Sequence, residues 1–192
     1  MRKPFMVEFT GTPEAGKTTS IKNVANKLRN EGYAVSVLEE SAEKLPNEIP
    51  KGTWNANLWM HYQTQAGILR ATYFDSDLVL IDRGLVDSDF YGKKFLWERV
   101  CTQEQYANFR KQFLNDLLPD FLIALVVEPK IAIQRRGGEG HLVNEMYIKK
   151  YNELFMKYFE GITTTKTLVN TETLDVYSMN ELIFQTIKKN LP

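Results

Sequence analysis

The chain has 192 residues, and 43% of them are apolar, which suits one domain with a sizeable core. The 24 lysines and arginines balance the 24 aspartates and glutamates, and this zero net charge argues against a protein that binds nucleic acid. No apolar run reaches the ~18 residues of a membrane span, and the N-terminus does not resemble a signal peptide. The single cysteine, Cys101, fits a reducing, cytoplasmic location.

Short apolar runs alternate with helical patterns along the chain. We expect strands at 4–9, 33–39, 76–82, 121–128 and 166–170. We expect helices from Lys17 to about Gly32 and at 54–73, 85–99, 103–117, 129–136, 143–160 and 179–190. Capping boxes at Thr102–Gln105 and Ser178–Glu181 support two of these helices. The alternation predicts an α/β domain spanning 1–192, with a five-stranded parallel sheet and helices on both faces.

A glycine-rich loop follows the first expected strand and opens the first helix. It matches the pattern G-x-x-x-x-G-K-[ST] with Gly11, Thr12, Pro13, Glu14, Ala15, Gly16, Lys17 and Thr18, followed by Thr19. Backbone N–H groups of such a loop and the helix N-terminus favour an anion. Lys17 can reach the β- and γ-phosphates, and the Thr18 hydroxyl can bind magnesium. The loop therefore predicts a site for ATP and Mg²⁺.

The third expected strand ends in Asp82 and Arg83, at the sheet edge where the glycine loop is also expected. A carboxylate beside a guanidinium can serve magnesium and a phosphoryl oxygen together, so Thr18 and Asp82 are the predicted metal ligands. The sequence has no Asn-Lys-x-Asp to read guanine, and Asp82-Arg83-Gly84 does not give the Asp-x-x-Gly of a GTPase switch. These observations favour phosphoryl transfer over a switch.

Four blocks together resemble deoxynucleoside kinases and thymidylate kinases: GTPEAGKTT, VLEESAEKL, LWMHYQTQAGILR and IDRG. The resemblance implies a P-loop NTPase fold and transfer from Mg-ATP to a nucleoside. It implies that Glu39, with Glu40 as the less favoured alternative, is the general base beside the catalytic residues Lys17, Asp82 and Arg83. It also implies that Gln63 reads the base and that Arg70 approaches the reacting hydroxyl.

The spacing in the third block also makes physical sense. Gln63 and Arg70 are seven residues apart and share one face of a helix, with Trp59 one turn before Gln63. A glutamine amide offers one donor and one acceptor to a base edge, and Trp59 can stack on the ring. These three residues are the predicted substrate-binding set, together with Arg83 and Asp87.

A lid is expected at about 135–143, where Arg135 and Arg136 precede a glycine-rich turn. Such a lid would exclude water and neutralise charge on the moving phosphoryl group, so both arginines are predicted to bind ATP. The following helix resembles the tyrosine-rich helix after the lid of these kinases. The spacing of Tyr147, Tyr151 and Tyr158 is more typical of core packing.

Several alternatives stay open at this point. Pro13 stands where thymidylate kinases carry an acidic residue, and Gly84 stands where the family has Ser or Tyr. The stretch DRGLVDSDFYG also resembles ribosylnicotinamide kinase-like ATPases, with Asp87 in the acidic position, whereas the deoxynucleoside kinase alignment favours Asp89. The acceptor is then a nucleoside, or a nucleoside monophosphate or another small metabolite. A regulatory ATPase without an acceptor is the alternative of another class.

Helices at 54–73 and 85–117, with Trp97, offer a surface for a homodimer.

Overall fold

A computed structural model describes residues 3–135 and 144–192. The strands are β1 (Phe5–Gly11), β2 (Val35–Leu38), β3 (Leu78–Asp82), β4 (Phe121–Val126) and β5 (Lys166–Asn170). They form a five-stranded sheet in the order β2-β3-β1-β4-β5, and every pair is parallel. The crossovers that parallel pairs require are supplied by the helices.

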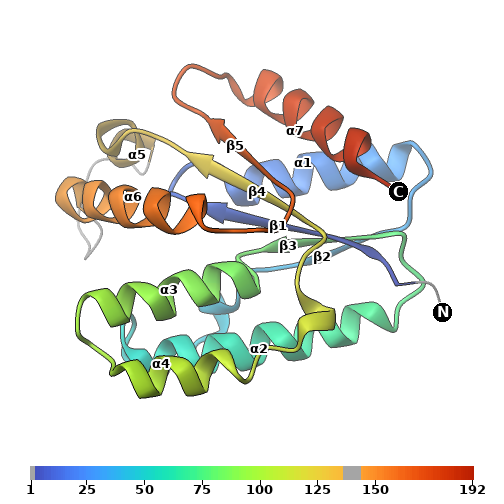
Figure 1. Ribbon diagram of the computed structural model, residues 1–192. Coiled ribbons are helices and arrows are strands. Elements are labelled where there is room, and N and C mark those ends of the chain that lie inside the picture. Colours follow the sequence, from blue (N-terminus) through green and yellow to red (C-terminus); the bar gives the residue numbers. More distant parts are fainter. Residues whose placement is uncertain (1–2, 136–143) are drawn as a thin grey trace.

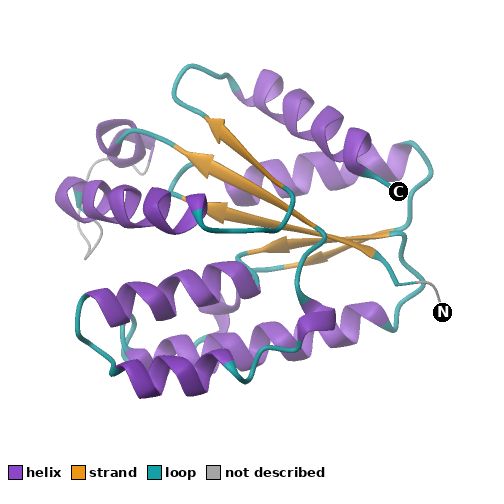
Figure 2. Cartoon of the chain, in the orientation of Figure 1, coloured by secondary structure: helices purple, strands orange, loops and turns teal. Residues whose placement is uncertain are grey.

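The helices are α1 (Lys17–Asn30), α2 (Trp54–Thr72), α3 (Leu85–Trp97), α4 (Gln103–Arg110), α5 (Pro129–Arg135), α6 (Glu145–Glu160) and α7 (Val176–Asn190). Two short 3₁₀ turns, η1 (Ser41–Lys44) and η2 (Asn115–Leu117), complete the described elements. In Figure 1, α1 and α7 cover one face of the sheet, while α2, α3 and α4 lie on the other. Figure 2 shows the strands between these layers of helices.

The core is divided by the sheet because successive side chains of a strand point to opposite faces. Val7 and Phe9 of β1 pack with α1 and α7, whereas Met6 packs with α2. On that second face, α3 and α6 also pack against β4 through Phe90, Tyr151 and Phe155. Strands covered on both faces explain the nearly continuous apolar runs in the sequence.

The predicted fold class is confirmed: the sheet has five parallel strands with helices on both faces. Two predicted helix boundaries are wrong. The helix expected over 103–117 ends at Arg110, and the chain continues through η2. The last helix begins at Val176, because Asp175 accepts the Ser178 N–H and forms the cap in place of the expected Ser178–Glu181 box. The capping box at Thr102–Gln105 is present as expected.

The parallel arrangement decides where a site can form, since the carboxyl ends of all strands meet at one edge. The loop after β1, the residues after β2 and the turn after β3 therefore lie together. The predicted lid at about 135–143 lies outside the described residues except for Arg135. Among the described helices, none combines the length and apolar character needed to cross a bilayer.

Candidate active site

The glycine loop between β1 and α1 has the backbone of an anion cradle. Gly11 (φ 109°) and Gly16 (φ 92°) adopt positive φ, and so does Glu14 (φ 62°), where a side chain makes that conformation costly. A Cβ on Gly11 would lie 3.0 Å from the Leu125 carbonyl carbon, so only glycine fits beside β4. Within the described chain, no side chain caps the N-terminus of α1. Its first N–H groups are thus available to a phosphate.

Lys17 lies inside this loop. Its Nζ donates to the Thr12 carbonyl at 2.7 Å and to the Gly11 carbonyl at 3.2 Å. Burial and, to a smaller extent, the nearby Arg83 together lower the pKa of Lys17 to about 7. A phosphate in the loop would favour the charged form of the ammonium group.

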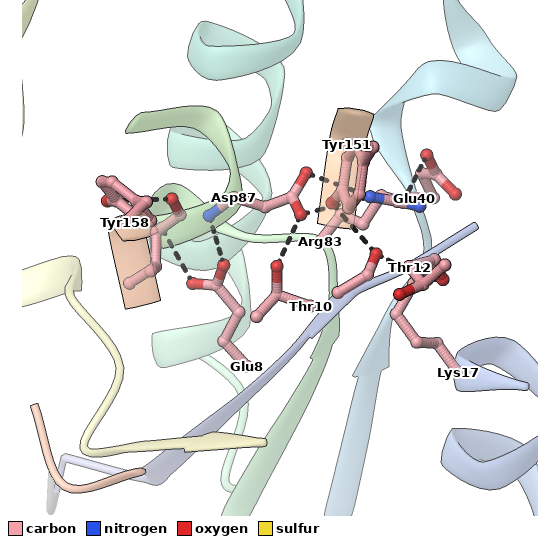
Figure 3. Close-up of polar contacts among 11 residues, drawn as sticks. Glu8, Thr10, Thr12, Lys17, Glu40, Arg83, Asp87, Tyr151 and Tyr158 are labelled. Atoms are coloured by element: carbon pink, nitrogen blue, oxygen red, sulfur yellow. Dashed lines mark hydrogen bonds and ion pairs between the residues drawn. The ribbon is translucent and has the colours of Figure 1, made fainter. Parts of the chain in front are cut away.

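Arg83 occupies a strained turn between β3 and α3. Its φ of 58° is positive, and its N–H donates to the Phe9 carbonyl at 2.9 Å. The guanidinium Nη1 lies 3.2 Å from Asp87 Oδ1, and Asp87 Oδ1 also accepts the Thr10 hydroxyl at 2.6 Å (Figure 3). Burial alone would lower the pKa of Arg83, but Asp87 and Glu40 raise it well above its ordinary value. Arg83 is therefore a fixed cation.

Of the two glutamates after β2, Glu40 faces this cation. Arg83 Nε lies 3.0 Å from Glu40 Oε1, an ion-pair distance without the angle of a hydrogen bond. Burial raises the pKa of Glu40, against the opposing effect of Arg83. The side chain of Glu39, the residue first favoured for the base, is 65% exposed, and its ion-pair partner is Lys44 at 3.9 Å. The structure thus brings Glu40 to Arg83, whereas Glu39 turns away from it.

The residues present fit a magnesium ion at the end of β3. Thr18 donates its hydroxyl proton to Asp82 Oδ2 at 2.6 Å, so the two predicted ligands are adjacent. The other oxygen of Asp82, Oδ1, is buried and has no hydrogen-bond partner among the described residues. A cavity of about 360 Å³ adjoins this pair, and its wall includes Glu39, Glu40 and Glu43. An unpartnered carboxylate oxygen beside a hydroxyl is the donor set that Mg²⁺ and its water shell prefer.

Two residues of α6 contact the glycine loop, and the sequence did not single them out for this. The Tyr151 hydroxyl donates to the Gly11 carbonyl at 3.0 Å. Asn152 accepts the Thr12 hydroxyl at 2.7 Å and donates to the Val127 carbonyl at 3.0 Å. Tyr151 is fully buried, as core packing predicts, and its hydroxyl links α6 to the glycine loop.

The predicted base-reading residues lie apart from this cluster. Gln63 and Arg70 are exposed on α2, and the Arg70 guanidinium lies 5.8 Å from the centre of the Phe74 ring. Trp59 is half-buried. Within the described chain, no hydrogen bond or ion pair joins Gln63 or Arg70 to Arg83. Their predicted roles stay predictions.

Of the remaining predicted site residues, some contact the cluster around Arg83 and others do not. Asp87 contacts Arg83, whereas Asp89 accepts the hydroxyls of Tyr106 at 2.9 Å and Tyr158 at 2.7 Å. The structure therefore brings Asp87, and not Asp89, into the cluster. Arg135 donates to the Thr171 hydroxyl at 2.9 Å and to its carbonyl at 2.6 Å. Arg136 lies outside the described residues.

The architecture has close counterparts among solved structures, although no protein-family profile matches the sequence. Deoxyadenosine kinase from M. mycoides with the products dCMP and a flexible dCDP bound superimposes with a TM-score of 0.75 at 22% identity, over 96% of this chain and 100% of that one. The same enzyme with dCTP gives 0.74 at 22% identity over 96% and 100%, and with dATP 0.75 at 22% identity over 96% and 99%.

This chain has the deoxynucleoside kinase fold. In this fold the glycine loop, the residues after β2 and the Asp82-Arg83 turn meet at one sheet edge. The resemblance of the four sequence blocks and the resemblance of the whole chain thus point to the same fold. At this level of identity the likeness concerns the fold, and the chemistry has to be argued from the side chains.

Proposed function

We propose that this protein transfers the γ-phosphoryl group of Mg-ATP to a hydroxyl of a nucleoside. The observation that carries the proposal is the ion pair between Glu40 and Arg83 beside the glycine loop. A site that only holds or hydrolyses ATP has no need of a half-buried carboxylate with a raised pKa next to a fixed cation. A kinase needs the carboxylate to accept the proton of the acceptor hydroxyl and the cation to stabilise the phosphoryl group during its transfer.

The donor half of the site is the glycine loop with α1. The N–H groups of the loop bind the phosphates, and Lys17 exchanges its bonds to the Gly11 and Thr12 carbonyls for phosphate oxygens. Thr18 and Asp82 would hold a magnesium ion, which would neutralise charge on the ATP phosphates when bound. Arg135 and Arg136 are proposed to contribute from the lid.

The acceptor half is the cluster around Arg83. Glu40 takes the proton of the attacking hydroxyl, and burial supports this role by raising the pKa of its carboxyl group. Arg83, held by Asp87, stabilises the charge that develops on the phosphoryl oxygens. We retain Trp59, Gln63 and Arg70 as the proposed base-reading set, because their spacing places them along one face of α2. Glu39 becomes the alternative base.

The choice of a nucleoside over a nucleoside monophosphate rests on charge. A monophosphate acceptor brings its own phosphate, which requires cations besides those that bind ATP. Arg83 is already paired with two carboxylates, Glu40 and Asp87. The similar deoxyadenosine kinase structures contain dCMP, dCTP and dATP, which supports a deoxynucleoside as the acceptor here.

The test is a screen of acceptors with Mg-ATP by coupled ADP release. Deoxynucleosides and ribonucleosides, their monophosphates and nicotinamide riboside are compared at equal concentration. The proposal expects a nucleoside to raise ADP release at least about tenfold above the rate without acceptor. A monophosphate or nicotinamide riboside as the best acceptor contradicts the substrate class. ATP binding with slow hydrolysis that no acceptor stimulates supports the regulatory ATPase instead.

A further inference from the structure

Glu8 lies in the middle of strand β1 and carries a buried carboxyl group. Its side chain is fully inaccessible to solvent. Glu8 Oε1 accepts the N–H of Asp87 at 2.8 Å, and Oε2 accepts the N–H of Val86 at 3.1 Å (Figure 3). Burial raises the pKa of Glu8 to about 8, and a buried carboxyl group needs such partners, because an unpaired one would be strongly destabilising.

The two N–H groups that Glu8 binds belong to the first turn of α3. Gly84 occupies the position before this helix, so Val86 and Asp87 are its second and third residues. These are the donors that a serine or threonine at the capping position would normally satisfy. Gly84 has no side chain to do so, and Glu8 supplies the oxygens from the neighbouring strand.

Space alone is enough to require a glycine at residue 84, which adopts φ −97° and ψ −143° before α3. A Cβ on Gly84 would lie 2.6 Å from Glu8 Cδ and closer still to Oε2. The carboxylate therefore fills the volume that a side chain at residue 84 would take. This accounts for the departure from the Ser or Tyr expected after the arginine.

Three consecutive residues of β1 hold the turn that carries the proposed catalytic cation. Glu8 binds the N–H groups of Val86 and Asp87, the Phe9 carbonyl accepts the Arg83 N–H at 2.9 Å, and the Thr10 hydroxyl binds the Asp87 carboxylate at 2.6 Å. Arg83 pairs with that same carboxylate at 3.2 Å. The position of Arg83 thus depends on the first turn of α3.

We propose that Glu8 caps α3 from the adjacent strand in place of a side chain at residue 84, and that this cap positions Asp87 and Arg83 for the reaction. The positioning of Asp87 and Arg83 for the reaction rests on the proposed function, whereas the cap of α3 does not. Glu8 is a positioning residue, since it touches neither phosphate nor acceptor. The exchange of one cap for another makes the proposal testable.

The experiment is a double-mutant cycle of Glu8→Ala and Gly84→Ser. Each single change should lower the Tm by about 5 °C, the first because two buried N–H groups lose their acceptor and the second because the serine collides with the carboxylate. In the double variant the serine occupies the vacated space and binds the same N–H groups. We expect it to recover at least about half of the Tm lost in Glu8→Ala.

The second measurement is kcat, which would stay unchanged if Glu8 only stabilised the fold. With the best acceptor, Glu8→Ala should lower kcat about tenfold, while the KM for ATP changes less than about twofold, because the glycine loop is untouched. The double variant should regain most of this kcat. Thr102→Ala, which removes the cap of α4, is the matched control: its Tm falls and its kcat stays.

Two results would overturn the inference. Additive Tm losses in the double variant, or a double variant that does not fold, would exclude an exchange of caps. An unchanged kcat in a folded Glu8→Ala protein would exclude the positioning role. If Glu8→Ala does not fold but the double variant does, the cap is supported. If the unaltered protein phosphorylates no acceptor, the proposed function fails, and the Tm cycle still decides whether Glu8 is the cap.

Discussion

His61 should make the stability of this protein fall at mildly acidic pH. The side chain lies in α2 with no solvent exposure, and its ring centre is 4.7 Å from that of Phe109 and 4.4 Å from that of Phe113. His61 Nε2 lies 2.9 Å from Gln65 Nε2, whose amide oxygen accepts the Leu114 N–H at 3.0 Å. The Gln65 amide therefore donates to the ring, and a protonated ring would place two donors against each other.

Burial lowers the pKa of His61 to about 4, from an ordinary value of 6.5. The unfolded chain binds a proton below about pH 6.5 and the folded chain does not, so stability is full above that value and is lost as the pH falls. A shift of this size corresponds to about 3 kcal/mol in total. About 2 kcal/mol of it should be lost between pH 7 and pH 5.

The assay is urea unfolding of the unaltered protein and of His61→Gln at about pH 7 and pH 5. The difference between the two proteins isolates His61, since other titrating groups contribute equally to both. We expect the free energy of unfolding to fall by about 2 kcal/mol more in the unaltered protein than in the variant. Equal losses, within about 0.5 kcal/mol, would refute the reasoning that His61 is neutral and enclosed.

Three further mutational tests address the site. Lys17→Ala should lower kcat/KM at least about hundredfold, whereas the same change at the exposed Lys189 should leave it unaltered; equal losses would argue against the phosphate role. Glu40→Gln should reduce kcat at least about hundredfold and Glu39→Gln less than about threefold, and the reverse order would return the base to Glu39. Asp82→Asn should raise the half-saturating Mg²⁺ concentration at least about tenfold in a magnesium titration, and an unchanged value would remove the proposed ligand.

Much of the fold follows from the sequence because the strands are covered on both faces, which makes their apolar runs continuous. The two wrong helix boundaries lie where tertiary contacts compete with the local sequence pattern. Phe113 and Leu117 continue the apolar spacing of α4, but the Leu114 N–H bonds to Gln65 on α2, outside any helix. Before α7, Asp175 and Ser178 are both residue types that commonly cap a helix, so the sequence alone does not decide between them. The helix starts at Val176, after Asp175, and its residue Met179 packs beside Gly16.

The site is predictable where its residues are adjacent in sequence and unpredictable where they are not. The glycine loop is a local motif, so its geometry follows the pattern. β2 ends at Leu38, and beyond a strand end the alternation no longer tells which of Glu39 and Glu40 faces the sheet edge. Tyr151 reaches the Gly11 carbonyl across 140 residues, and no sequence spacing reports such a contact.

The central claim is that a phosphoryl group passes from ATP to a nucleoside hydroxyl and not to water. The direct measurement is the fate of the label from γ-labelled ATP, separated into nucleoside monophosphate and inorganic phosphate, with the acceptor at saturation. We expect the label in the monophosphate to exceed the label in inorganic phosphate at least about tenfold, and Glu40→Gln to reverse this preference. Label that appears only as inorganic phosphate with every acceptor would contradict the account.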